Sequence, residues 1–441
     1  MRTPAQRELD RAIARLAVPA FLTLITEPLL LLGDAAIVGH LGTRELAALG
    51  LAGAVVQTVI GLCIFLAYGT TARVARLLGA DGRREAIAQG VDGLALAVVI
   101  GVPVTLGVAL AARPLVDLFG AGEEVATEAA AYLRVAALGV TPLLVMLAAT
   151  GVLRGLQDTR TPLVVAVGGN LANLALNAVL VYPAGLGLQG SALGSVIAQV
   201  LMAAALTVAV ARGARSAGAR LRPRASGVAL IARAGLPLIV RTLTLRAALL
   251  LTTYAVTLGA TGRALEVDLA THQLATTVWS LLAFVLDALA IAAQALTGRS
   301  LGAGDVAEVR AITRRLLGWS VVVGVVTGVA VALASPVLGV PFTDDTAVRD
   351  RLVPVLLVAA VGQLLAGPVF LLDGVLIGAG DGRYLAIAGV VVGLVYAPLV
   401  LLAGPHGLVA VWSVFVVVLM GGRALTLFQR ARGGAWMVTG T

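Results

Sequence analysis

The chain is 441 residues long, with 59% hydrophobic and only 12% charged residues and a mean hydropathy of +1.01. Because a soluble domain has roughly 25% charged residues, this composition excludes a soluble fold, and the length accommodates about twelve spans of roughly 20 apolar residues each. The net charge of +9 does not indicate a nucleic-acid-binding protein, because the arginines lie between apolar runs and form no basic stripe interleaved with aromatic residues.

Apolar runs interrupted by Gly, Pro and charged residues predict about twelve transmembrane helices. In chain order we place them at residues 13–38, 46–78, 86–112, 127–152, 161–182, 190–211, 228–258, 268–298, 307–333, 350–376, 384–403 and 406–428. The arginine-rich start of the chain resembles a signal peptide, but the first apolar run continues to Val38 without a small-residue cleavage site. We therefore interpret it as a retained first span.

Arginine is unevenly distributed between the two sides of the predicted spans. All 32 basic residues are arginine, and most lie on the side that also holds both termini and the cluster between Arg212 and Arg233. By the positive-inside rule this side is cytoplasmic. We therefore expect a multi-pass protein of a bacterial inner membrane with both termini in the cytoplasm.

Several segments of the chain occur twice at one spacing. Residues 151–160 recur at 374–383, an offset of 223 positions, and residues 135–139 and 76–80 recur at the same offset as 358–362 and 299–303. The first helix of the second half fits with an offset of 218, pairing Val18 and Pro19 with Leu236 and Pro237. Matches in register indicate an internal duplication.

The duplication predicts an all-α integral membrane protein with two six-helix lobes, residues 1–211 and 227–441, joined by an arginine-rich cytoplasmic linker, residues 212–226. Because each half contains an even number of spans, both halves enter the membrane from the same side and the repeat is parallel. This architecture is typical of alternating-access transporters, whose substrate cavity lies between the lobes near the middle of the membrane.

The first predicted helix carries two carboxylates and an internal proline. A charged side chain at the centre of a span costs about 2.5–3.5 kcal/mol on insertion scales, so it needs a partner, water or a function. Glu27 and Asp34 are seven residues apart and share one helix face, while Pro28 removes a backbone donor and favours a kink. We expect Asp34 to be a proton-coupling residue, against the structural alternative that it only cross-links helices. For Glu27 the functional and structural interpretations have equal weight.

The fifth predicted helix carries an amide stripe. Asn170, Asn173 and Asn177 fall at i, i+3 and i+7, hence on one face. Amides there hold a carboxylate, coordinate a cation or contact a substrate, although polar stripes also join membrane helices.

Polar residues of the second half form another set of candidates. Asp287 and Gln294 are seven residues apart in the eighth helix, and Asp373 lies in the tenth. Arginines within spans are candidate ion-pair partners, namely Arg241, Arg246 and Arg134. For these residues we weigh structural pairing and transport chemistry equally.

Catalytic and metal-binding signatures are absent from the sequence. The histidines His40, His272 and His406 do not cluster, Cys63 is single, and no phosphate-cradling loop, zinc pair or nucleophile elbow occurs. We expect no metal, no organic cofactor and no enzyme. An intramembrane transferase is a competing class, but it would need paired metal-binding carboxylates or a catalytic histidine.

Residues 28–42, with Asp34 at their centre, resemble the multidrug and toxic compound extrusion (MATE) family, and so do residues 151–162. Residues 287–294 and 373–381 are similar to the DNA-damage-inducible, DinF-like branch of that family. The resemblance implies a twelve-helix antiporter that exports small organic, often cationic or amphipathic, compounds against inward H⁺ or Na⁺. It also implies that Asp34 is the family's first-helix carboxylate and Asn173 the amide beside it.

The sequence departs from the family at two places that bear on the coupling ion. Asn177 stands where many relatives carry a second carboxylate, and Thr252, Thr253 and Tyr254 occupy the region of the seventh-helix acid of sodium-coupled members. We therefore expect protons rather than sodium to be the coupling ion. An isolated aspartate in a low-dielectric surrounding exists in either protonation state near neutral pH, so a proton and a cationic compound would compete for it.

The expected partners are small organic compounds and membrane lipids, with no nucleic acid, and we expect a monomer. An alternative function is a flippase for a lipid-linked precursor.

Overall fold

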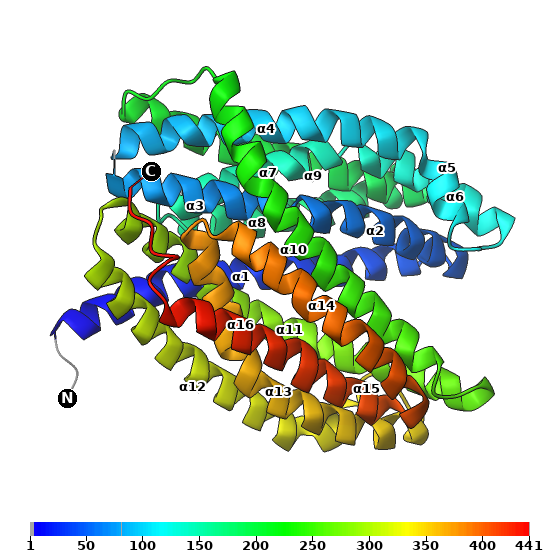
Figure 1. Ribbon diagram of the computed structural model, residues 1–441. Helices are drawn as coiled ribbons and strands as arrows, with labels where there is room; N and C mark the ends of the chain where they lie inside the picture. Colours follow the sequence, from blue (N-terminus) through cyan, green and yellow to red (C-terminus); the bar gives the residue numbers. More distant parts are fainter. Residues whose placement is uncertain (1–3, 81, 441) are drawn as a thin grey trace. The chain divides into compact units, whose positions relative to one another are not determined.

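The computed structural model describes residues 4–80 and 82–440. The regular secondary structure of these residues is entirely helical, with no strand (Figure 1). The all-α fold expected from the sequence is therefore confirmed. The helices are α1 Pro4–Gly39, α2 Thr43–Cys63, α3 Phe65–Ala80, α4 Arg83–Leu110, α5 Ala112–Asp117, α6 Glu123–Ala137, α7 Val140–Gly155, α8 Arg160–Val181, α9 Gly187–Ser216, α10 Ala225–Thr257, α11 Gly262–Gly302, α12 Val306–Leu338, α13 Thr346–Gly378, α14 Gly382–Ala403, α15 Leu408–Val414 and α16 Gly421–Arg432. A 3₁₀ turn, Gly404–His406, precedes α15, and a π-helical segment, Phe415–Met420, joins α15 to α16.

Eleven helical segments are long and apolar enough to cross a membrane, and the bent pair α6 and α7 is a twelfth candidate. Each of the twelve overlaps one span expected from the sequence. The span predicted at residues 127–152 consists of two helices, because α6 and α7 meet at a bend of 46°. At that bend the side chain of Gln199 fills the space that a Cβ on Gly139 would need.

The chain folds into two compact units. Residues 15–235, together with Gly440, pack into one unit, and residues 4–14 and 236–439 pack into the other. Helix α9 continues to Ser216 and α10 begins at Ala225, so the stretch between these two helices is shorter than the predicted linker, 212–226. The helix α9 ends in a Schellman-type turn in which Gly218 has a φ of 63° and the amide of Ala219 donates to the carbonyl of Ala214.

Helix packing within each unit repeats at the offset found in the sequence. In the first unit a Cβ added to Gly151 of α7 would lie 2.6 Å from the carbonyl oxygen of Ala67 in α3. In the second unit a Cβ added to Gly374 of α13 would lie 2.5 Å from the carbonyl oxygen of Ala290 in α11. Glycines one turn later, Gly155 and Gly378, face Thr71 and Gln294 in the same way. Only glycine permits these close helix contacts, so the duplicated sequence preserves a duplicated packing.

A buried ion pair holds the linker against the first unit. Asp92 of α4 is fully buried and accepts hydrogen bonds from both terminal nitrogens of Arg220, at 2.8 and 2.6 Å. The backbone amide of Arg224 donates to the same carboxylate at 2.8 Å, and Gln89 donates to the carbonyl of Gly227 at 3.3 Å. These contacts order the part of the linker that lies between α9 and α10, residues 217–224, and the first turn of α10.

The start of α1 is tied to the second unit by another ion pair. Arg315 of α12 contacts both oxygens of Asp10, at 2.6 and 2.5 Å, and the indole nitrogen of Trp319 donates to Asp10 at 3.0 Å. Residues 4–14 of α1 therefore pack with the second unit, whereas the part that carries Asp34 packs with the first.

Candidate functional site

Three helices of the first unit bring polar side chains together around Asp34. Asp34 of α1 is buried, and the amide nitrogen of Asn177 in α8 donates to its Oδ1 at 2.6 Å. The same nitrogen lies 3.1 Å from the Oδ1 of Asn173, whose own amide nitrogen donates to the hydroxyl of Ser195 in α9 at 3.0 Å. We call Asp34, Asn173, Asn177 and Ser195 the Asp34 cluster.

Backbone contacts between α1 and α8 fix the register of this cluster. Asn170 donates to the carbonyl of Thr26 at 3.3 Å, and the hydroxyl of Tyr182 donates to the carbonyl of Ile37 at 2.7 Å. Residue numbers increase in the same direction along both helices between these two contacts, so α1 and α8 run parallel. Asp34 lies between the two contacts. Each tie uses a backbone oxygen and therefore positions α1 without occupying its acid.

A glycine makes room for the central amide. The Oδ1 of Asn177 occupies the place where a Cβ on Gly194 of α9 would be. Asn177 is completely buried, and its Oδ1 has no hydrogen-bond partner among the residues that the structure describes. A buried acceptor without a donor is costly, so this oxygen marks a place where a proton donor or a cation would be stabilised.

Not every residue of the predicted N-terminal set lies in the cluster. Glu27 is exposed and accepts a hydrogen bond from Gln57 of α2 at 3.1 Å, and it is seven residues, roughly 10 Å, from Asp34 along α1. The side chain of Asn170 donates to a backbone carbonyl, that of Thr26. The amide stripe is thus divided, with Asn173 and Asn177 beside the acid and Asn170 holding the helix that carries it.

Ser195 was not among the residues singled out from the sequence. A signal was present, because Gly190 and Gly194 form the small-residue spacing that allows close approach of membrane helices. Ser195 follows the second of these glycines and reaches the facing helix α8 through Asn173.

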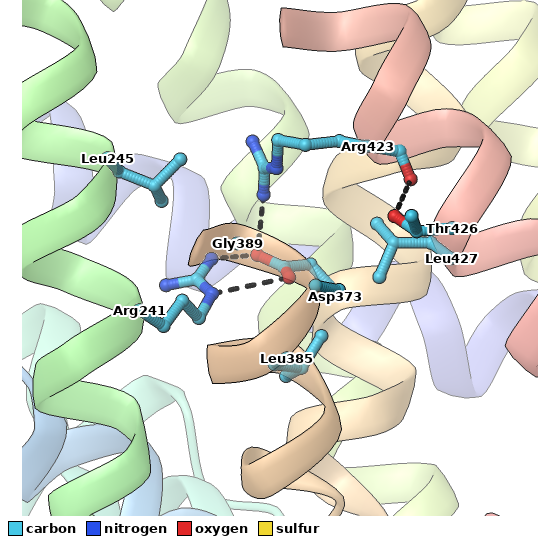
Figure 2. A pocket seen from close by; sticks show the side chains of 9 residues that line it. Arg241, Leu245, Asp373, Leu385, Gly389, Arg423, Thr426 and Leu427 are labelled. Carbon is cyan, nitrogen blue, oxygen red and sulfur yellow. Dashed lines mark hydrogen bonds and ion pairs between the residues drawn. The ribbon is translucent and has the colours of Figure 1, made fainter. Parts of the chain in front are cut away.

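In the second unit, Asp373 of α13 lies between two arginines (Figure 2). Arg241 of α10 pairs with both of its oxygens, and Arg423 of α16 donates to Oδ2 at 3.0 Å. A pocket of about 20 Å³, large enough for one water molecule, adjoins the three side chains. Asp287 of α11 interacts electrostatically with Arg423. The sequence offered Arg241 as one of three candidate partners, but Arg423 was not among them.

The remaining candidates of the second unit lie apart from this ion cluster. Gln294 is buried in α11, where its backbone packs against Gly378. Arg246 and Arg134 are exposed, and neither has an ion pair within residues 4–80 and 82–440. Arg246 is therefore not the partner of Asp373.

The duplicated positions of the Asp34 cluster hold a different pair. Thr252, which corresponds to Asp34, lies 2.6 Å from the phenol oxygen of Tyr396, which corresponds to Asn173. Both side chains are buried. The contact between the two helices is kept in the second unit, but a hydroxyl and a phenol replace the acid and the amide.

These features define a multi-pass membrane protein of transporter architecture. A multidrug resistance MATE family transporter of the MOP superfamily, solved in an outward-facing conformation, superposes with a TM-score of 0.87 over all of both chains at 23% identity, which shows the shared fold. Protein DETOXIFICATION 44, chloroplastic, of Arabidopsis thaliana is 30% identical over 98% of this chain and 83% of its own length. DNA damage-inducible protein F of Escherichia coli is 27% identical over 97% of this chain and 94% of its own length.

The family model MatE matches residues 19–179 and 243–402, one stretch in each half. The chain belongs to the MATE family and is a multidrug or toxic compound efflux transporter. The resemblance seen in the sequence is therefore confirmed, and the relatives give no support to the flippase alternative.

Proposed function

We propose that the protein exports small organic compounds in exchange for protons by alternating access, and that Asp34 carries the coupling proton. The observation that supports this most is the contact between Asp34 and Asn177 inside a membrane-spanning helix pair. A buried carboxylate that accepts a hydrogen bond from an amide, with no cation beside it, can bind and release a proton, and its charge changes when it does so.

The Asp34 cluster contains a partner for each protonation state of the acid. When Asp34 is ionised, it accepts from the amide nitrogen of Asn177. When it is protonated, its hydroxyl becomes a donor, and the Oδ1 of Asn177 is an acceptor without a donor. Protonation would therefore rearrange the hydrogen bonds that join α1 to α8. Two prolines inside α1, Pro19 and Pro28, favour bending of that helix in response.

Sodium is the second candidate for the coupling ion. The oxygens of Asn173, Asn177 and Ser195 are suitable ligands for a hard cation beside the Asp34 carboxylate. The cluster supplies only one negative charge, which favours a proton. In the second unit, Asp373 is neutralised by Arg241 and Arg423.

The remaining features of the proposal concern the setting of the transporter. We assign both termini to the cytoplasm from the uneven distribution of the arginines, and we propose a monomer in a bacterial inner membrane. Glu27 is exposed within a span, so we assign it to a water-accessible surface on which organic cations would bind.

Purified protein in proteoliposomes with an imposed gradient of either H⁺ or Na⁺ tests the proposal. Export of a cationic dye should follow the pH gradient and should not respond to the sodium gradient at fixed pH. Dye movement that responds to the sodium gradient alone would show that sodium is the coupling ion. Dye movement without any gradient would contradict coupling altogether. Asp373→Asn is the control for Asp34→Asn, since it removes a membrane-embedded acid that is already paired with two arginines and should leave proton coupling in place.

A further inference from the structure

Arg246 lies on the exposed face of α10. The exposed side chains of this stretch recur at Leu243, Arg246, Leu250 and Tyr254, which is the spacing of one helix face. The opposite face is buried and includes Thr252 and Ala248. Arg246 has neither an ion pair nor a side-chain hydrogen bond within residues 4–80 and 82–440. Its guanidinium is thus available to another molecule.

The position of Arg246 along the helix places it inside the hydrocarbon core. Helix α10 has 33 residues, and a bilayer core takes about 20 of them. The core segment begins after Arg233, the last arginine before the apolar part, so it starts between residues 234 and 238 and extends to residues 253–257. Arg246 is close to the middle of every such segment. A guanidinium at that depth cannot reach either headgroup region and is costly in lipid, so this face of α10 borders water.

The other arginine of the same core segment behaves differently. Arg241 is largely buried and is paired with Asp373 (Figure 2). Its charge is therefore compensated within the second unit and contributes to helix packing. Arg246 lies five residues later on the opposite side of the helix, and no carboxylate of the described residues pairs with it. Structural pairing explains Arg241 and does not explain Arg246.

The internal repeat supplies a second observation. With the offset of 218 for this helix, Arg246 corresponds to Pro28 of α1, next to Glu27. The two related helices therefore expose opposite charges at neighbouring repeat positions, a carboxylate in the first half and a guanidinium in the second. Each of the two related helices therefore exposes one charged side chain in this region, and the two charges are of opposite sign.

We propose that Arg246 binds the anionic group, a carboxylate above all, of exported compounds that carry one. This inference rests on the proposed export function and names the residue of this chain that recognises that group. A guanidinium binds a carboxylate through two parallel hydrogen bonds, which ammonium groups cannot reproduce. Tyr254, on the same face, adds an aromatic surface against which a flat organic compound would pack.

Two dyes that differ in one group test the inference. Rhodamine 110 has a free carboxyl group and rhodamine 123 carries the methyl ester of that group, so only the former offers a carboxylate. Binding is measured by fluorescence anisotropy with the purified full-length protein, and export is measured in proteoliposomes under a pH gradient. We expect Arg246→Gln to weaken the binding of rhodamine 110 about tenfold or more, and to change that of rhodamine 123 less than about twofold.

Two further variants separate recognition from general effects of charge. Arg246→Lys keeps the positive charge but lacks the planar guanidinium with its two parallel donors. It should therefore recover only part of the affinity for rhodamine 110. Arg222→Gln removes an exposed arginine of the linker and should affect neither dye. Equal losses for both dyes in Arg246→Gln, or a wild-type protein that does not bind rhodamine 110, would overturn the assignment. Proton-driven export of rhodamine 123 reports separately on the proposed function, since it does not depend on a carboxylate.

Discussion

The amide nitrogen of Asn177 lies 2.6 Å from a carboxylate oxygen of Asp34, across the interface of two parallel membrane helices. The contact joins α1, which contains two internal prolines, to α8, which Ser195 of α9 contacts from another side. A change in the charge of Asp34 therefore acts directly on the packing of α1 against α8. The predictions below test the parts of this arrangement separately.

Gly194→Ala should impair proton coupling without touching the acid. The added Cβ would take the space of the Asn177 Oδ1, so the amide would have to turn away from Asp34. We expect proton-driven dye export to fall at least about tenfold, because a displaced amide loses a charge-assisted hydrogen bond. The matched control is Gly168→Ala in α8, where an added Cβ meets nothing within 4 Å. Equal export by the two variants would show that the position of Asn177 is unimportant.

The two residues of the linker ion pair should differ in their effect on stability. Arg220→Gln leaves the fully buried carboxylate of Asp92 without its countercharge, which we expect to cost about 3–5 kcal/mol. Asp92→Asn leaves a partly exposed guanidinium that water hydrates, so the expected cost is smaller, about 1–3 kcal/mol. Unfolding of both variants in detergent gives the comparison, and trypsin cleavage after Arg224 reports on the order of the linker. A larger loss in Asp92→Asn would contradict the buried position of the acid.

The stability contributed by the ion pair between Asp92 and Arg220 should also be insensitive to pH near neutrality. Its hydrogen bond to Asp92 raises the pKa of the Arg220 guanidinium above the ordinary value. Stability from a raised pKa is present below the unfolded-state value and is lost only as the pH rises through the folded-state value, which lies far into the alkaline range. The difference in unfolding free energy between wild type and Arg220→Gln should therefore not decrease between about pH 7 and pH 9. A decrease over that interval would show that another group carries the effect.

The repeated glycine contacts should be equally sensitive in both halves. An added Cβ at Gly151 or Gly374 would meet a backbone carbonyl, which cannot turn aside as a flexible side chain does. We expect each alanine variant to lower the unfolding free energy by about 1–3 kcal/mol. Gly107→Ala in α4 has open space around its Cβ and should be neutral or slightly stabilising. Unchanged melting of Gly151→Ala and Gly374→Ala would contradict the close packing of α7 on α3 and of α13 on α11.

The spans, the duplication and the acid were predictable because each has a local signature. Apolar runs of sufficient length define membrane helices, and an aspartate inside one stands out from its neighbours. The spacing of Asn173 and Asn177 placed both on one face of a helix, and the structure brings Asn177 into contact with Asp34 and Asn173 into contact with Asn177. Their role in transport remains a prediction.

Pairings between distant segments were not predictable in the same way. Asp92 and Arg220 are separated by more than a hundred residues, as are Asp10 and Arg315, and neither member has a pattern that identifies the other. Arg423 lies near the end of the span predicted at residues 406–428 and was not among the candidate partners, whereas α16 brings it to Asp373. The bend at Gly139 depends on the side chain of Gln199 in another helix. Such features follow from tertiary packing rather than from local propensity.

The most direct test of proton coupling through Asp34 is the proton flux that accompanies dye export in proteoliposomes, measured with a pH-sensitive dye inside the vesicles. We predict that Asp34→Asn abolishes this flux, while Asp373→Asn, which removes an acid already neutralised by two arginines, retains it in every molecule that folds. Circular dichroism and dye binding verify that both variants are folded. A normal proton flux in folded Asp34→Asn, or its loss only in Asp373→Asn, would contradict the account.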